Sequence, residues 1–225
     1  MLRLDVPLSH PQFGKAQACD GETHAPERLK RLSSISKIPL PFLNRQLDDI
    51  RQNPGNAEML IAARGMIDDP FGFLYIWGGP GNAKSEVLIA LCNHFNENGR
   101  TAVYIKFKKI LDFMKDSFSE KRKRERDPFA NDGYIDRFNR LVSAPVLAID
   151  EMDKAKMTEF AEEFRFDFLD DRYMQAQAGE TITLFAGNDD PKKFPSAVWD
   201  RLRDGRFKVV ENTAGSARPK MRRSK

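Results

Sequence analysis

The chain has 225 residues, of which 40% are hydrophobic and 31% charged, and a formal net charge of +4. This composition is ordinary for a globular protein, and the length allows one α/β domain with a substantial core. No apolar run approaches the ~20 residues of a membrane helix, and the N-terminus lacks the apolar region of a secretory signal. Cys19 and Cys92 lie in dissimilar contexts, so we expect no disulfide framework and a reduced, cytoplasmic protein without membrane partners.

The two ends of the chain differ in composition from its middle. Residues 1–36 are polar and rich in proline, histidine and glycine, and they predict a loosely structured N-terminal arm that could dock a partner. Within the arm, His10, Cys19 and His24 are too irregularly spaced to indicate a zinc site. Residues 213–225 form a basic C-terminal tail, and its charge points towards nucleic acid.

Between these ends, strands alternate with helices, a pattern that predicts a parallel sheet built from βαβ units. Each predicted strand is a short apolar run, and each predicted helix has apolar residues at helical spacing. We predict strands at residues 73–77, 101–107, 144–149, 181–186 and 207–210. We predict helices at residues 43–52, 57–67, 85–98, 108–118, 134–142 and 158–177, with an extended lead-in at 38–42 and a charged loop at 120–132.

The first strand runs into a glycine-rich turn, which neither a strand nor a helix tolerates, and a helical pattern resumes at Lys84 and Ser85. This is the layout of a nucleotide phosphate loop, in which the turn amides and the helix N-terminus cradle phosphates. Lys84 would reach the β- and γ-phosphates, and Ser85 would ligate Mg²⁺. The predicted nucleotide-binding residues of this stretch are Gly78, Gly79, Pro80, Gly81, Asn82, Ala83, Lys84, Ser85 and Glu86.

The third strand ends in two carboxylates, Asp150 and Glu151. In a parallel sheet, residues at the carboxyl ends of strands share the rim on which the phosphate loop lies. Asp150 would bind the nucleotide through the Mg²⁺ shell, and Glu151 would orient and polarise the attacking water. The alternative is an acidic surface turn after a core strand, but the phosphate loop upstream favours the functional interpretation.

Two further polar groups follow later elements. Asn188 comes directly after the fourth strand, where its amide could hydrogen-bond the γ-phosphate or the water; alternatively, it only forms a turn. Three arginines, Arg201, Arg203 and Arg206, surround the end of a helix. Arginine suits bidentate phosphate contacts, but a solvated helix end is the alternative, and composition does not decide between the two.

The chain resembles the DnaC/IstB-like family of AAA+ ATPases, which are helicase loaders and transposition helper ATPases, in the segments GGPGNAKS, VLAIDE, FAGN and WDRLRDG. The resemblance covers about residues 36–218. It implies a three-layer α/β P-loop NTPase (AAA+) domain at residues 37–212, with a five-stranded parallel sheet and a reduced or absent helical lid. It also implies ATP and Mg²⁺ as cofactors and a homo-oligomer with ATP at the subunit interfaces.

The same resemblance implies roles for single residues. Asn188 matches the polar sensor of the γ-phosphate. Arg201 matches an arginine finger that is given in trans to a neighbouring subunit. Arg218 matches a second arginine sensor, although Ala217 stands where the family has an aromatic residue.

Ala83 departs from the phosphate-loop motif, which has glycine at this position. Its methyl group could crowd the backbone or disfavour a positive φ. However, Ala-Lys-Ser in this place resembles the phosphate loops of MCM helicases and MoxR-type AAA+ proteins. We therefore expect ATP binding to be retained.

A basic loop lies between the second and third strands. In replication-initiator relatives, additions in this region face the central channel and touch single-stranded DNA, and Phe118 or Phe129 could stack on bases. The alternative is a solvated loop. The predicted DNA-binding residues are Lys121, Arg122, Lys123, Arg124 and Arg126.

Three functions stay open at this point. The favoured one is an ATPase that loads a replicative helicase and binds single-stranded DNA. An IstB-like transposition helper would instead bind duplex DNA and a transposase. A nucleotide-sensing binding protein would show little turnover, because Ala83 would disable the loop.

Overall fold

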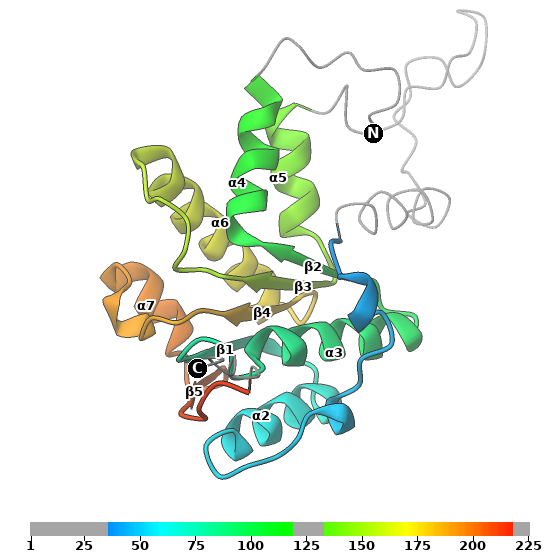
Figure 1. Ribbon diagram of the computed structural model, residues 1–225. Helices are drawn as coiled ribbons and strands as arrows, with labels where there is room; N and C mark the ends of the chain where they lie inside the picture. The colour runs from blue at the N-terminus through cyan, green and yellow to red at the C-terminus, as the bar shows by residue number, and fades with distance from the viewer. Residues whose placement is uncertain (1–35, 119–132, 218–225) are drawn as a thin grey trace, which may run out of the picture.

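The computed structural model describes residues 36–118 and 133–217, which form a five-stranded parallel sheet between two layers of helices (Figure 1). The strand order is β2-β3-β4-β1-β5, and all five predicted strands are present. The strands are β1 (Gly72–Gly78), β2 (Ala102–Lys106), β3 (Val146–Asp150), β4 (Ile182–Ala186) and β5 (Lys208–Asn212). The helices are α2 (Ala57–Asp68), α3 (Lys84–Glu97), α4 (Phe107–Lys115), α5 (Tyr134–Val142), α6 (Glu159–Gln177) and α7 (Ser196–Leu202).

Alternate residues of each strand pack against opposite helix layers, because successive side chains of a strand point to opposite faces. On β1, Phe73 and Tyr75 belong to the core beneath α4, α5, α6 and α7. Leu74 and Ile76 belong to the core beneath α2 and α3. Burial on both faces explains the continuous apolar runs of the strands, and it confirms the predicted three-layer α/β fold.

A buried arginine ties α6 to the amino ends of two central strands. The Arg172 side chain is fully buried. Its guanidinium donates hydrogen bonds to the carbonyls of Val142, Ala144 and Ile182 and to the Thr183 hydroxyl. These groups lie at the end of the sheet opposite to the phosphate loop, so Arg172 is a structural residue.

The predicted helix at residues 43–52 is wrong. The chain forms two short 3₁₀ turns instead, at Leu40–Phe42 and Leu47–Asp49. The physical reason is tertiary: the Asn93 amide on α3 donates to the carbonyls of Phe42 and Arg45, both at 2.9 Å. Those carbonyls are therefore held away from the i+4 pattern that an α-helix requires.

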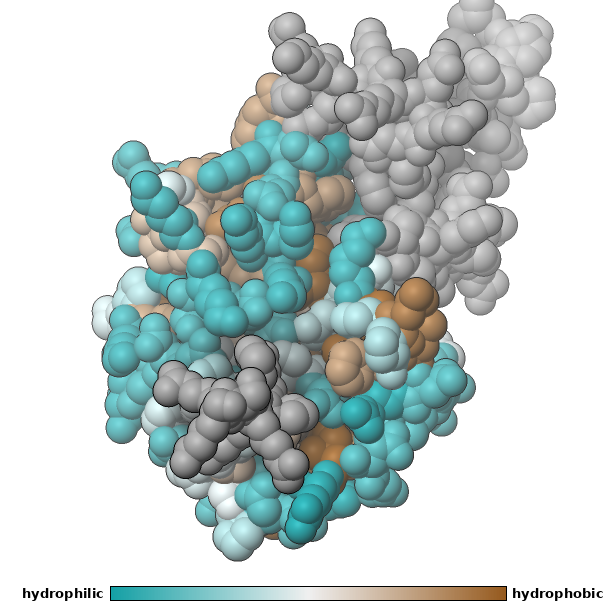
Figure 2. Space-filling view, in the orientation of Figure 1, coloured by the Kyte–Doolittle hydropathy of each residue, from teal (hydrophilic) through white to brown (hydrophobic). Residues whose placement is uncertain are grey.

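No helix in the two described stretches is long and apolar enough to cross a membrane. The face shown in Figure 2 is mostly hydrophilic.

Several predicted features lie outside the described residues. They are most of the N-terminal arm with His10, Cys19 and His24, the basic residues Lys121, Arg122, Lys123, Arg124 and Arg126, the aromatic Phe129, and Arg218.

Candidate functional site

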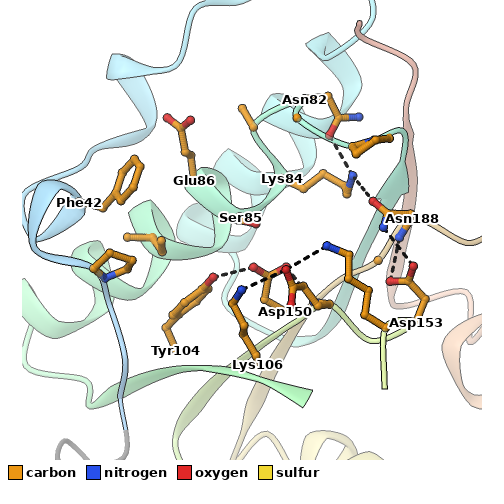
Figure 3. Close-up of a pocket in the computed structure, with 18 of the residues that line it drawn as sticks. Phe42, Asn82, Lys84, Ser85, Glu86, Tyr104, Lys106, Asp150, Asp153 and Asn188 are labelled. Carbon is orange, nitrogen blue, oxygen red and sulfur yellow. Dashed lines mark hydrogen bonds and ion pairs between the residues drawn. The ribbon is translucent and has the colours of Figure 1, made fainter. Parts of the chain in front are cut away.

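The strand order brings the predicted site residues together. Because β4 lies between β1 and β3, Asn188 after β4 stands between the phosphate loop after β1 and Asp150 at the end of β3. These carboxyl ends border a cleft of about 530 Å³ (Figure 3). Its lining includes the predicted residues Pro80, Gly81, Asn82, Ala83, Lys84, Ser85, Glu86, Asp150, Glu151 and Asn188.

Lys84 lies at the centre of the predicted phosphate loop and is only 7% exposed. Its Nζ donates to the carbonyls of Gly78 and Gly79, both at 2.7 Å, and to Asn82 Oδ1 at 3.0 Å. It also reaches Asn188 Oδ1 at 3.3 Å. Burial lowers the pKa of Lys84, while the negative charge of Asp150 opposes this shift. The ammonium is thus fixed where the predicted phosphates would bind.

The backbone of the loop is held close to β5. A Cβ on Gly78 would lie 2.1 Å from the Asn212 carbonyl oxygen, so only glycine allows this approach. The Asn82 and Asn212 amides each donate to the other residue's carbonyl, at 3.0 and 2.7 Å. Asn212 is fully buried, and it was not identified from the sequence. After β5, the chain returns to the loop, where the Ala217 amide donates to the Gly81 carbonyl at 2.8 Å.

Ala83 adopts a left-handed conformation, with φ of +69° and ψ of +10°. The position therefore requires the positive φ that glycine provides in the motif, and the concern raised by the sequence was justified. In this chain the alanine takes up that conformation, and α3 begins at the next residue, Lys84, as a phosphate loop requires.

Asp150 is 4% exposed and receives one hydrogen bond on each carboxylate oxygen. The Tyr104 hydroxyl donates to Oδ2 at 2.6 Å, and the Glu151 amide donates to Oδ1 at 2.8 Å. Burial raises the pKa of Tyr104, and the Asp150 charge adds to this shift while Ser85 opposes it. The phenol therefore stays protonated as a donor. Tyr104 carries no motif, and the sequence did not identify it.

Glu151 borders the cleft, and its Oε1 accepts hydrogen bonds from Lys106 and Lys154, each at 3.0 Å. Burial would raise the pKa of Glu151, but the bonds from Lys154 and Lys106 together outweigh it and hold the pKa below its usual value. The backbone of Glu151 is left-handed, with φ of +56°. Neither lysine was expected here, although Lys106 ends β2 at the same rim.

Asn188 is oriented by Asp153, which is another residue that the sequence analysis missed. The backbone amide of Asn188 donates to Asp153 Oδ1 at 3.0 Å, and its Nδ2 donates to Oδ2 at 3.1 Å. These two hydrogen bonds fix the side chain so that Asn188 Oδ1 faces Lys84. The only hint in the sequence was that Asp153 follows Asp150 and Glu151 closely.

The donor set fits a Mg²⁺–nucleotide. The Ser85 hydroxyl and the Asp150 carboxylate supply hard oxygen ligands beside Lys84, and no group of three or more His, Cys, Asp or Glu side chains within the described residues could hold a metal alone. Mg²⁺ usually takes one or two protein ligands and completes its shell with water and substrate phosphates. One side chain of the predicted set, Glu86, instead pairs with Arg45 at 2.9 Å.

Arg201 is not part of this cleft. It lies on α7, where its guanidinium pairs with Asp170 of α6 and donates to the Ala197 carbonyl at 2.9 Å. The guanidinium also lies over the Phe166 ring, 5.2 Å from its centroid. Within its own subunit, Arg201 is therefore held away from the phosphate loop, and the predicted role in trans stays a prediction.

A glycine-rich turn after β1, with Asp150 at the end of β3 and Asn188 after β4 on the same rim of a five-stranded parallel sheet, is the arrangement of the P-loop NTPase fold in its AAA+ form. Comparison with protein-family models and with curated proteins found no match. Comparison with solved structures found the DnaC helicase loader, with a TM-score of 0.61 and 14% identity over 78% of this chain and 100% of that chain.

Two other solved structures agree with this fold. The DnaI structure matches with a TM-score of 0.60 and 16% identity over 84% of this chain and 100% of that chain. The replication initiator DnaA bound to AMPPCP and single-stranded DNA matches with a TM-score of 0.62 and 16% identity over 77% of this chain and 52% of that chain. The chain thus spans about half the length of the replication-initiator structures, and these identities show the fold alone.

Proposed function

We propose that this protein is a Mg²⁺-dependent ATPase that acts as a helicase loader in DNA replication. The observation that carries the proposal is the cleft itself, in which Lys84, Asp150, Glu151 and Asn188 converge from three strand ends. The structural likeness to a helicase loader and to a replication initiator bound to AMPPCP and single-stranded DNA supports it. Single-stranded DNA and a replicative helicase are the partners we propose.

Each of the predicted residues would have a separate role in ATP hydrolysis. Lys84 and the amides of the loop would hold the β- and γ-phosphates. Ser85 and Asp150 would hold Mg²⁺, which neutralises phosphate charge when bound. Glu151 would orient the attacking water, and Asn188, which contacts Lys84, would report on the γ-phosphate. Arg201 would complete the site of a neighbouring subunit, with ATP at the interface.

Two variants test the ATPase. We expect Lys84→Ala to abolish ATP binding, since it removes the cation at the centre of the loop, and Glu151→Gln to bind ATP while hydrolysis is blocked. Binding is measured with a fluorescent ATP analogue, and hydrolysis by phosphate release. Lys192→Ala, which removes an exposed lysine that does not line the cleft, is the matched control. Normal hydrolysis by Lys84→Ala would show that the proposed site is wrong.

The DNA partner is tested with the ATP-bound Glu151→Gln protein. We expect it to bind single-stranded DNA more tightly than duplex DNA. Replacement of Lys121, Arg122, Lys123 and Arg124 by serine should reduce that affinity and its salt dependence. A preference for duplex DNA would favour the transposition helper instead. A wild-type hydrolysis rate equal to that of Glu151→Gln would favour a nucleotide sensor.

A further inference from the structure

Tyr104 reaches from β2 into the predicted metal site, although no motif marks it. Its hydroxyl donates to Asp150 Oδ2 at 2.6 Å, and Ser85 borders the same part of the cleft (Figure 3). The Tyr104 side chain is 4% exposed, so water hardly competes for this bond. A short hydrogen bond to a carboxylate is among the stronger ones in proteins.

The hydrogen bond from Tyr104 is one of two that fix the orientation of the Asp150 carboxylate. The Glu151 amide already donates to the other carboxylate oxygen at 2.8 Å. With one donor on each oxygen, the carboxylate cannot rotate without losing a bond. Each oxygen still has a second lone pair for a metal ion or its water. Asp150 is thus oriented and remains able to act as a ligand.

The backbone of Tyr104 is itself fixed at the edge of the sheet. Its amide donates to Ser36 Oγ at 3.1 Å, and its carbonyl accepts a hydrogen bond from the Lys37 amide at 2.8 Å. β2 is an edge strand, so these bonds replace those of a missing neighbour. Tyr104 therefore joins the segment that leads into the domain to the carboxylate of the metal site.

We propose that Tyr104 is a positioning residue for the Mg²⁺ site: its hydroxyl orients Asp150 and so increases the affinity for metal-bound nucleotide. This inference rests on the proposed function, because it assumes that the cleft binds Mg²⁺–ATP. Partners that orient a metal ligand typically contribute 10–100-fold to metal affinity. Tyr104 would act through Asp150 and would not touch the nucleotide.

The test compares nucleotide binding with and without the metal. A fluorescent, non-hydrolysable ATP analogue is titrated into wild type and Tyr104→Phe, in Mg²⁺ and in EDTA. We expect the gain in affinity from Mg²⁺ to fall about tenfold in Tyr104→Phe, while the affinity in EDTA, which depends on the phosphate loop, stays the same. Tyr75→Phe is the matched control, since its hydroxyl is buried on the same sheet without a hydrogen-bond partner among the described residues.

A double-mutant cycle tests the route of the effect. If Tyr104 acts through Asp150, Tyr104→Phe should cause no further loss of Mg²⁺-dependent affinity in an Asp150→Asn background. An equal gain from Mg²⁺ in Tyr104→Phe and wild type overturns the inference. Absence of nucleotide binding, or of any gain from Mg²⁺, in the wild type would instead overturn the proposed function.

A second variant keeps the inference testable even if Tyr104→Phe does not fold. Ser36→Ala keeps the phenol but removes the bond that holds the Tyr104 amide. We expect a loss of Mg²⁺-dependent affinity in the same direction, of about twofold to threefold. If Tyr104→Phe does not fold, as judged by thermal unfolding, an unchanged gain in Ser36→Ala overturns the inference.

Discussion

Two residues of the cleft, Ala83 and Glu151, hold a left-handed backbone without being glycine. Such conformations persist only where the surrounding structure determines them, and they cluster at functional sites. For Ala83, the determinants are the fixed turn before it and the start of α3 after it. For Glu151, they are the hydrogen bond that its backbone amide donates to the Asp150 carboxylate and the ion pairs with Lys106 and Lys154.

We expect Ala83→Gly to stabilise the protein slightly. The left-handed conformation costs an L-residue roughly 1–2 kcal/mol, whereas the greater freedom of glycine in the unfolded chain costs about 0.4–1 kcal/mol. The net gain in the free energy of unfolding is therefore between about 0 and about 1.6 kcal/mol, measured from the urea midpoint at constant slope. Affinity for ATP should change little, because α3 already starts at Lys84.

The control for this variant is Ala62→Gly, in the middle of α2. There the backbone is helical, and glycine should destabilise by about 1 kcal/mol. Opposite signs for the two substitutions would confirm that the backbone conformation decides the outcome. Destabilisation by Ala83→Gly to the same extent as by Ala62→Gly would contradict the argument.

At the scale of single residues, the sequence predicted the residues that its motifs contain, but it did not predict the residues that position them through hydrogen bonds. Lys84, Asp150 and Asn188 were predicted, and they converge as expected. Tyr104 and Asp153, which hold Asp150 and Asn188, were not. Their positions have no motif of their own: each contact depends on strand register and on the order of strands, which a local pattern does not encode.

Among the secondary-structure elements, α6 is tied to the central strands by a fully buried arginine, Arg172. Arg172 is buried without a carboxylate partner within the described residues, and it is satisfied by carbonyls at the end of α5 and the starts of β3 and β4. Its loss would leave at least three buried carbonyls with one donor fewer each. An unsatisfied buried group costs about 1–3 kcal/mol.

We expect Arg172→Met to destabilise the protein by about 3–5 kcal/mol, since methionine fills part of the volume but donates no hydrogen bond. Arg172→Lys keeps the charge and some donors and should cost less. Both are measured by guanidinium chloride unfolding. As a control, Arg64→Met on α2 removes a half-exposed arginine and should change stability by less than about 0.5 kcal/mol. Equal effects at positions 172 and 64 would contradict the anchor role.

The elements themselves were largely predictable, because the strands are fully buried and so read as continuous apolar runs. Their observed bounds lie within two residues of the predicted ones, except that α4 ends at Lys115, three residues before the predicted end. The failure at residues 43–52 has a tertiary cause, the Asn93 amide on α3. Likewise, a polar residue in the run DDRYM of α6 suggests solvent exposure, and only the packed fold shows that Arg172 is buried.

On the scale of the whole molecule, Arg201 does not line the cleft of its own subunit, so the role proposed for it in hydrolysis requires a second copy of the chain. Phe166, Asp170 and Met174 follow one face of α6 at four-residue spacing, and Arg201 pairs with Asp170 in their midst. Phe166 is 39% and Met174 62% exposed. Two partly exposed apolar side chains beside a paired arginine are consistent with a contact between subunits.

A mixing experiment decides whether Arg201 acts in trans. We expect Arg201→Ala and Lys84→Ala each to be inactive alone, the first because it lacks the finger and the second because it lacks the phosphate lysine. In an equimolar mixture, an intact Arg201 from one variant meets an intact Lys84 from the other at about a quarter of randomly assembled interfaces. Phosphate release should therefore recover to about that fraction of the wild-type rate and fall on dilution.

Arg203→Ala, on the same helix end, serves as the control and should keep full activity alone. A mixture that stays inactive at high concentration would rule out complementation, and Arg201 would then have no role in the neighbouring cleft.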